Sequence, residues 1–530
     1  MINLAEYMSN TSTAKKSFLK KEIRITSGNF LLASLIYLAL PVLIFFIGYL
    51  KPWWAILFSA ITIAGSFLAW RSTIAKGKEP KNYERSVNIK ISYFLFLIPV
   101  VLLFVYIGGV GEFSWCVGDH RVRYAILNDL VEYKWPVIYD FSTQHNPVVC
   151  EALGQGKVAF AYYFVFWMVP ALFGKIFGLM AARIVVCLWS ALGLILLALG
   201  AMLLYGKESK FLFIAIMLFA GFDVFPYFYH QFSGFGSSWE DWTLHFRVVG
   251  NFYQIMNVFH QSIPGWLITV LLLQAANSSY VGLLGSLMFC YSPWAAIGIL
   301  PLCIVKLFTA NKGLARKQVV SNLLTVANIA APIIFFICFA SLYLANSNAR
   351  YDNGFIWNFY DNKFQLVFDY VLFVVFEFGI WALIIRKKFR KDPMFVASVL
   401  TMLIIPFYKM TAPNDFLMRG SMAPLFVIAL MSSMYVTDNF NEMLEKDNRK
   451  VKPRLVVLSF FVAAFTSLNF MLTSVLLTSM IYAKTEPAQD MTTGIVSFGD
   501  IRDEQYLEMV DVQFFVYDYE DNTFFKYLAK

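Results

Sequence analysis

The chain has 530 residues, of which 59% are hydrophobic, 18% aromatic and only 15% charged. Soluble globular domains contain about 45–50% apolar and about 25% charged residues, so this chain has too few polar residues to cover its apolar surface. The composition excludes a soluble multidomain protein, a disordered chain, a collagen-like chain and a disulfide scaffold, and it predicts a polytopic membrane protein. The formal net charge of +9 does not indicate nucleic-acid binding, because the basic residues form short clusters between apolar runs, where they set membrane orientation.

Long apolar runs alternate with polar segments along the chain. A helix needs about 20 apolar residues to cross the hydrocarbon core of a bilayer. We therefore expect an all-α membrane protein with about thirteen transmembrane helices. The expected spans are 29–50, 54–70, 91–110, 178–204, 211–229, 263–276, 281–292, 294–309, 319–344, 366–385, 393–407, 422–437 and 455–482.

The basic clusters predict the orientation of these spans. Under the positive-inside rule, Lys and Arg accumulate in cytoplasmic segments. With thirteen spans every cluster falls on the same side, so we expect a cytoplasmic segment 1–28, a transmembrane domain 29–482 and an extracytoplasmic tail 483–530. The clusters lie within 15–24, 71–90, 207–210, 312–317, 386–391 and 446–454.

Two large outer loops follow from this topology, one over 111–177 and one over 230–262. Within the first, the apolar stretch 158–173 predicts an interfacial helix. Counting it as a span would move every later basic cluster to the outer side, and it is short for a crossing. We expect a bacterial inner membrane, because no eukaryotic targeting signal is evident; an endoplasmic-reticulum membrane with a lumenal site is the alternative.

An aspartate near the start of the first outer loop is the candidate catalytic group. Asp119 follows the end of a predicted span within a short polar sequence, 118–123. A carboxylate at headgroup depth is partly desolvated, and desolvation raises its pKa towards neutrality, which suits a general base. The alternative is a solvated ion pair with Arg121 or Arg123.

The order of features around Asp119 resembles a known family. After Asp119 come His145-Asn146-Pro147, the interfacial stretch, a Phe-Gly pair and Arg183 at the start of the next span. Over about 90–205 this order is similar to the class C (GT-C) glycosyltransferases, among them protein O-mannosyltransferases and the aminoarabinose transferase of lipid A. The resemblance implies a polyprenyl-phosphate-linked sugar as donor and Asp119 as the catalytic residue. The chain has two extra spans before this loop, and its subfamily and its acceptor (a glycan, a lipid or a protein) stay open.

A lipid-phosphate leaving group needs a cation at headgroup depth. Arginine offers a planar fork of N–H donors that suits phosphate. Arg419 is the first candidate and Lys409 the second, because a positive charge on the outer side runs against the topological bias. The alternative for Arg419 is an i, i+4 ion pair with Asp415.

Other polar residues of the outer segments are candidates for substrate binding. The acids of the second outer region could bind the acceptor or a divalent cation, or serve only as helix caps and solvated charges; no cofactor is certain. Cys116 and Cys150 could form a disulfide or remain free thiols. The substrate-binding candidates, besides Lys409 and Arg419, are His120, Arg123, His145, Asp223, Glu240, Asp241, His260 and Gln261.

Two other functions remain open at this point. Asp369 and Glu377 are ionisable residues within a predicted span, eight positions apart and so roughly on one helix face, as in a proton-coupled transporter. A non-catalytic protein of envelope polysaccharide assembly would share the topology without requiring Asp119. The expected partners are the donor lipid, the acceptor and the bilayer, with no nucleic acid.

Overall fold

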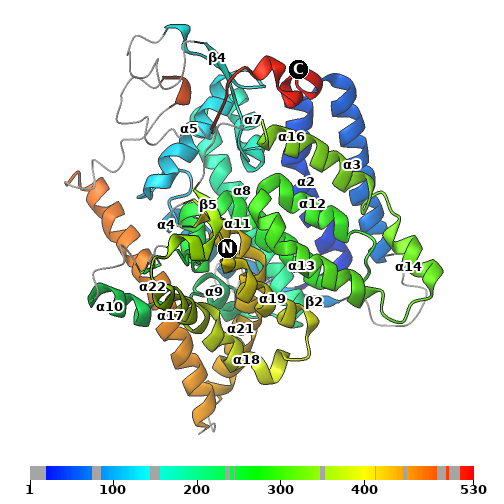
Figure 1. Cartoon of the computed structure of the whole chain (residues 1–530). Coiled ribbons are helices and arrows are strands. Elements are labelled where there is room, and N and C mark those ends of the chain that lie inside the picture. The colour runs from blue at the N-terminus through cyan, green and yellow to red at the C-terminus, as the bar shows by residue number, and fades with distance from the viewer. Residues whose placement is uncertain are drawn as a thin grey trace, which may run out of the picture.

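The computed structural model is mostly helical, with short strands at its edges (Figure 1). The structure describes residues 19–74, 85–143, 156–232, 239–240, 242–243, 245–345, 352–411, 414–445, 450–485, 497–500 and 514–530.

Among these described residues, seven helices are long and apolar enough to cross a membrane. This finding agrees with the prediction of a multi-pass helical membrane protein. The seven are α2 (Ser27–Tyr49), α3 (Pro52–Ile74), α8 (Leu179–Tyr205), α11 (Asn251–Gln274), α13 (Pro293–Ala310), the continuous α17–η5–α18 helix (Lys363–Phe389) and α22 (Val451–Tyr482).

Further apolar helices are shorter than 18 residues or more polar. They include α4 (Ile91–Ile107), α7 (Met168–Phe177), α12 (Val281–Tyr291), α19 (Pro393–Ile404) and α21 (Met422–Met443). Two expected spans are interrupted. The span expected over 211–229 divides into α9 (Lys210–Met217) and α10 (Val224–Phe232). The span expected over 319–344 divides into α14 (Arg316–Leu323) and α15 (Ala330–Phe335). Helix α15 continues through η3 (Phe336–Ala340) into α16 (Ser341–Tyr343).

The second interruption has a clear physical cause. Asn328, between α14 and α15, donates from Nδ2 to the carbonyls of Ser278 and Asn322, at 2.8 and 2.9 Å, and accepts from the amide of Gly282 at 2.7 Å. These bonds fix a turn in the backbone where the sequence predicted a continuous helix. A hydropathy average does not register a single polar side chain of this kind.

Small residues bring the central helices close together. At Gly193 of α8, an added Cβ would lie 2.4 Å from Ile263 of α11. At Gly200, about two turns further on, it would lie 2.5 Å from Phe30 of α2 and 2.7 Å from Val270 of α11. Helices in a membrane associate largely through such close packing at small residues. Helices α2, α8 and α11 therefore form the tightly packed centre of the bundle.

A small antiparallel sheet caps one end of the bundle, with the strand order β3 (Ile138–Asp140), β4 (Lys157–Phe160) and β7 (Phe515–Val516). The predicted interfacial helix over 158–173 is therefore wrong at its start. Residues 157–159 pair with β3, and residues 159–160 pair with β7. Helical backbone begins only at η2 (Val165–Trp167) and α7. The C-terminal residues continue to the corner between α2 and α3, where Lys530 donates to the carbonyl of Tyr49 at 2.9 Å.

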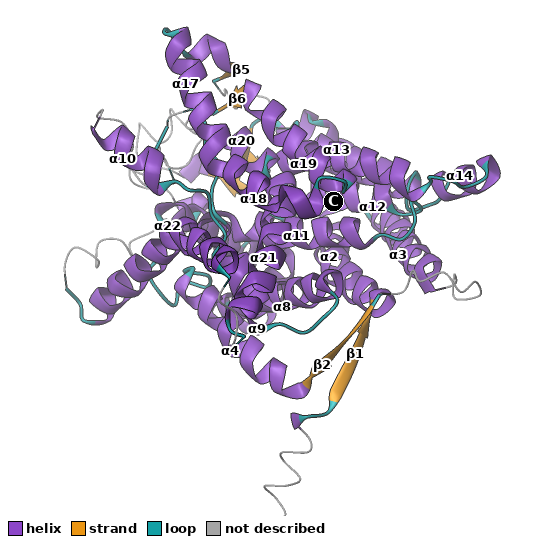
Figure 2. Cartoon of the chain, turned by 90° about the horizontal axis from the view of Figure 1, so that it is seen from below, coloured by secondary structure: helices purple, strands orange, loops and turns teal. Residues whose placement is uncertain are grey.

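A second strand pair lies apart from the helices. Strands β1 (Glu22–Thr26) and β2 (Ser86–Lys90) form an antiparallel ribbon that extends away from the helical body in Figure 2. The ribbon joins the residues that precede α2 to those that precede α4. It therefore fixes the positions of the first turns of these two helices relative to each other.

The contact between α13 and the short helix α20 (Asp415–Gly420) yields a first prediction. A Cβ at Gly298 would lie 1.7 Å from the carbonyl oxygen of Gly420. Gly298→Ala must therefore push the two helices apart, and overpacking of this kind costs about 1–3 kcal/mol. We expect a lower apparent melting temperature in detergent. Gly285→Ala is the matched control, because the added Cβ would meet only Cys303 at an ordinary 3.5 Å; equal losses in both variants would contradict the prediction.

Candidate functional site

Helix α5 (Gly118–Glu132) presents Asp119 in its first turn. The N-terminus of a helix favours a negative charge there. One turn later Arg123 pairs with Asp119, with 2.8 Å between Nη2 and Oδ2. The Asp119 side chain keeps 62% of its surface accessible, whereas Arg123 keeps only 6%. A substrate can therefore reach the carboxylate, while the arginine is held in the protein behind it.

Three arginines from separate segments act on Asp119. Burial raises the pKa of this carboxyl, but Arg123, Arg247 and Arg419 together outweigh the effect and hold the pKa below its ordinary value. The prediction that desolvation brings Asp119 towards neutrality is therefore wrong, because the neighbouring guanidinium groups dominate. Asp119 is a carboxylate at neutral pH.

The short helix α20 positions Arg419. Asn414 begins this helix, and its side chain accepts from the amide of Leu417 at 3.1 Å and donates to the carbonyl of His245 at 2.9 Å. The cap thus ties α20 to the segment that carries Arg247. We predicted from the sequence that Arg419 and Asp119 belong to one site. In the structure the charge of Arg419 acts on the Asp119 carboxyl group.

Both ion pairs that the sequence offered as alternatives form, although the pair of Asp119 with Arg123 is not a solvated one, because Arg123 is buried. Arg419 pairs with Asp415 at 2.7 Å, one helical turn away, just as Arg123 pairs with Asp119. Neither pair uses all the donors of its arginine. Arg123 Nη1 and Arg419 Nε are buried and have no hydrogen-bond partner among the described residues. Buried donors nearly always have a partner, so these two indicate a place for an anion.

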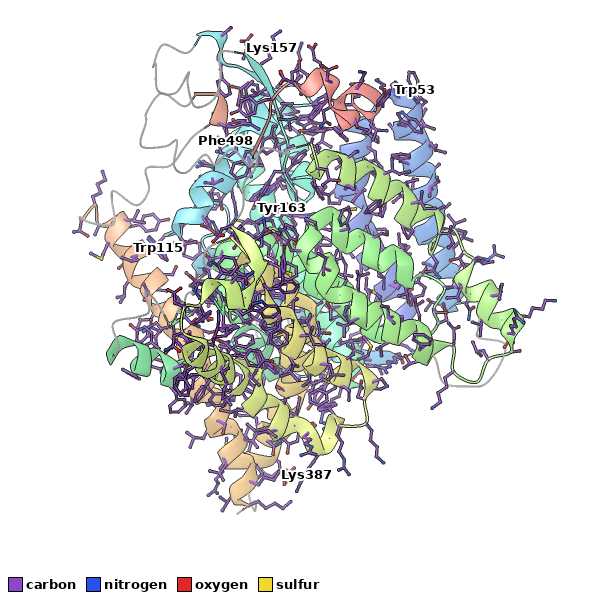
Figure 3. All side chains as sticks on the ribbon, viewed as in Figure 1. Trp53, Trp115, Lys157, Tyr163, Lys387 and Phe498 are labelled. Carbon is purple, nitrogen blue, oxygen red and sulfur yellow. The ribbon has the colours of Figure 1, made fainter. Side chains whose placement is uncertain are left out.

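An aromatic pair borders the arginines. The rings of Tyr162 and Tyr163 stack with centroids 3.8 Å apart, and the guanidinium of Arg419 lies 5.9 Å from the centre of the Tyr163 ring. Both tyrosines are partly exposed. They lie between β4 and η2, in the turn that replaces the start of the predicted interfacial helix, and Figure 3 labels Tyr163 within the densely packed upper half of the molecule.

Lys409 lies with a different set of residues. It is in β6 (Tyr408–Met410), which pairs with β5 (Asn353–Phe355). Its Nζ atom is 3.8 Å from Asp352 and 4.2 Å from the centre of the Phe359 ring. Burial lowers the pKa of His245 to about 4, and the charge of Lys409 adds to the effect. The charge of Lys409 therefore acts on His245, whereas the charge of Arg419, the other predicted cation, acts on Asp119.

His120 stabilises a break in α11. Val258 has non-helical angles there (φ −138°, ψ 33°), and the nearby carbonyl of Met256 contacts Nε2 of His120. Burial lowers the pKa of His120 to about 3, with a further contribution from Arg123. The imidazole is therefore neutral and donates its N–H to the carbonyl.

The placement of His260 and Gln261 corrects the predicted topology. Both residues were expected at the end of an outer loop, 230–262, but they lie inside α11 and are fully buried. The helix begins at Asn251, because its polar first half is surrounded by protein rather than by lipid. His260 Nε2 and Gln261 Nε2 are 3.1 Å apart, and the ring of His260 lies parallel to that of Tyr163 at 6.5 Å.

Two acids of the second outer region, Asp223 and Glu240, are not solvated loop charges. Glu240 is buried, and both its oxygens accept from the amide of Gly250 at 3.1 Å. Asp223 is fully buried beside Glu377. Within the described part of the chain, no group of three or more His, Cys, Asp or Glu residues could hold a metal ion.

Three residues singled out from the sequence, His145, Asp241 and Cys150, lie outside the described residues. Cys116 is a free thiol that donates to the carbonyl of Gly109 at 3.2 Å. Of the two alternatives for Cys116, the structure thus shows the free thiol.

Sequence reasoning missed Arg247 and the Tyr162–Tyr163 pair. The signal for Arg247 was present, since an arginine in a predicted outer loop runs against the positive-inside bias. The same argument selected Arg419. The two tyrosines had no such signal, because aromatic residues are also common at membrane interfaces.

Asp129, near the other end of α5, anchors the helix to the C-terminal segment. Its Oδ2 accepts from the Tyr139 hydroxyl at 2.8 Å and from the Phe498 amide at 2.9 Å. Burial raises the pKa of Asp129 from 3.8 to about 6, and the hydrogen bonds offset only part of that effect.

This raised pKa predicts a pH-dependent stability. Between about pH 4 and 6 the folded protein holds a proton on Asp129 that the unfolded chain has released, so stability falls as pH rises through this window, by roughly 3 kcal/mol at most. Asp129→Asn has no proton to lose. The melting temperature of the variant minus that of the wild type should therefore increase from pH 4 to pH 6.5 and then level off. A difference that is constant over this range would contradict the assignment.

No protein-family model, curated protein or solved structure matches the chain. The candidate site consists of an accessible carboxylate, three arginines from separate segments and two buried N–H donors that have no hydrogen-bond partner in the described part of the chain.

Proposed function

We propose that the protein transfers a sugar from a polyprenyl-phosphate-linked donor to an acceptor hydroxyl on the extracytoplasmic side of the membrane. One observation carries the proposal. Asp119 is accessible and ionised, Arg123 pairs with it at 2.8 Å, and the charges of Arg247 and Arg419 also act on it. A base for the acceptor and cations for a phosphate leaving group are thus adjacent, as a displacement at a sugar phosphate requires.

The proposed reaction is a single displacement. The acceptor hydroxyl gives its proton to the Asp119 carboxylate while its oxygen bonds to the anomeric carbon of the sugar. The bond between that carbon and the phosphate oxygen breaks, and the phosphate departs with both electrons towards the arginines. Attack from the face opposite the phosphate inverts the anomeric configuration through an oxocarbenium-like transition state, as in inverting glycoside hydrolysis.

The lowered pKa of Asp119 fits this reaction in one particular way. A carboxylate with a low pKa is a weak base, so it removes a proton efficiently only after the hydroxyl has become acidic. Bonding to an oxocarbenium-like carbon has that effect on the attacking oxygen. The arginines that weaken the base are also the groups that stabilise the departing phosphate, and in this arrangement bond breaking leads and proton transfer follows.

The membrane arrangement is part of the proposal. The seven long helices and several of the shorter apolar ones would make the thirteen crossings, with the basic clusters in the cytoplasm and a bacterial inner membrane as the location. Lys387, in one such cluster, lies at the opposite end of the molecule from Lys157 and Trp53 (Figure 3). This separation supports a topology in which the sheet that includes Lys157 is extracytoplasmic.

The transporter hypothesis has one observation in its favour. Asp223 and Glu377 form a buried carboxyl pair, and buried ionisable groups within a membrane often mark proton pathways. The predicted partner of Glu377 was Asp369, but Asp369 accepts from Tyr360 at 2.9 Å and from Gln365 at 2.6 Å. A non-catalytic assembly protein remains the third hypothesis, and it does not need Asp119.

Asp119→Asn tests the proposed reaction directly. An amide cannot accept the proton, so we expect transfer of a radiolabelled hexose from polyprenyl phosphate by the purified protein to fall by about 10²–10⁴-fold. Asp140→Asn is the control, because Asp140 is an exposed carboxylate of the same region that bonds only locally to Ser142, at 2.6 Å. Unchanged transfer in a folded Asp119→Asn protein would remove Asp119 from the proposed role.

Arg123→Gln tests how the base is kept ionised. Arg123 makes the largest contribution to lowering the pKa of Asp119, so its loss should raise that pKa and shift the acidic limb of the kcat/KM profile to higher pH. The measurement is sugar transfer between pH 4 and 8. Arg183→Gln, which removes an arginine paired with Glu112 instead, should leave the limb in place. A limb that does not move in Arg123→Gln would show that another group sets it.

A further inference from the structure

The segment that carries Arg247 is held by a buried acid from a distant helix. Trp242, five residues before Arg247, donates from Nε1 to Oε1 of Glu377 at 3.0 Å. Both side chains are buried. Glu377 lies in η5 (Val374–Gly379), a π-helical turn within the Lys363–Phe389 helix. Such turns are rare and frequently occur at functional sites.

One backbone and one side-chain hydrogen bond hold the same helix against the chain that precedes α10. The amide of Phe222 donates to the carbonyl of Phe376 at 2.8 Å, and Nε1 of Trp381 donates to the carbonyl of Ala220 at 3.0 Å. These bonds bring Asp223 to Glu377. Oδ1 of Asp223 and Oε2 of Glu377 each lie 2.8 Å from the position of an added Cβ at Gly221, so the two carboxyl groups are close neighbours.

Two adjacent carboxylates in a buried site cannot both stay charged without a cation, because the desolvation of each charge and their mutual repulsion add. Glu240, a further acid, also acts on Glu377. Neither oxygen of Asp223 has a hydrogen-bond partner of good geometry among the described residues. One proton between Asp223 and Glu377 satisfies the pair and leaves Oε1 of Glu377 as the acceptor for Trp242.

We propose that Glu377 and Asp223 are positioning residues: their proton-sharing carboxyl pair fixes Trp242 and thereby holds Arg247 beside Asp119. The segment is anchored on both sides of Arg247. Trp242 is bound to Glu377 before it, the carbonyl of His245 accepts from Asn414, and the Gly250 amide is bound to Glu240 after it. Arg247 lies between these anchors, and its charge reaches Asp119. The consequence for sugar transfer rests on the proposed function, whereas the anchoring itself does not.

Substitutions at Glu377 separate positioning from proton transport. In Glu377→Gln the amide oxygen can still accept from Trp242 and the amide NH₂ can donate to Asp223, so the anchor survives. We expect transfer activity within twofold of wild type. Glu377→Leu and Trp242→Phe each break the anchor, and we expect kcat/KM to fall at least tenfold in both. A proton-coupled transporter would instead lose solute flux in liposomes in Glu377→Gln, and that result would overturn the proposal.

Hydrogen exchange tests the anchor without any assay of sugar transfer. In the full-length protein in detergent, amides of residues 243–250 should exchange at least tenfold faster in Trp242→Phe than in wild type, and at the wild-type rate in Glu377→Gln. Trp239→Phe is the matched control, since Trp239 lies in the same segment and stacks on Tyr227 with ring centroids 4.0 Å apart. Unchanged exchange in Trp242→Phe would overturn the anchoring. Faster exchange in a protein that transfers no sugar would uphold it and refute only the proposed function.

Discussion

Charge in an apolar protein interior must be balanced locally, and this constraint shapes the candidate site. Arg123 and Arg419 are buried, and each has a carboxylate one helical turn away. Removing one partner of such a pair leaves an uncompensated charge, which costs more than the pair itself contributes. The helices α5 and α20 therefore supply each arginine together with its counter-charge. Arg247, from a third segment, adds a positive charge near Asp119.

The sequence predicted the structure well where a residue type has one main cause for its position, such as apolar residues in a membrane-spanning helix. Long apolar runs predicted helices such as α2, α8 and α22 close to their observed bounds. The unexpected positive charge of Arg419 identified a residue that does act on Asp119. The pKa of Asp119 was mispredicted, because its sign depends on how many cations surround it. That number is a property of the tertiary structure, since Arg247 and Arg419 come from segments far from α5.

The misplaced start of α11 has a related cause. Hydropathy assigns polar residues to loops on the assumption that a helix in a membrane faces lipid. The first half of α11 faces other helices instead, so Asn251, Gln254 and His260 can be buried within it. Asn251 Nδ2 donates to the carbonyl of Ile216 at 2.7 Å, and Gln254 Nε2 to that of Val249 at 3.0 Å. A polar helix at this depth is stable only when protein supplies its partners.

The unpartnered donors near Asp119 also bear on which ligand the site would take. Arg123 Nη1 and Arg419 Nε are buried N–H donors without a hydrogen-bond partner among the described residues, and both belong to positively charged groups. A phosphodiester carries one negative charge and offers acceptor oxygens for both donors. Hydrogen bonds between two charged groups are stronger than those to a neutral acceptor, so these donors favour a sugar phosphate over an uncharged transported substrate.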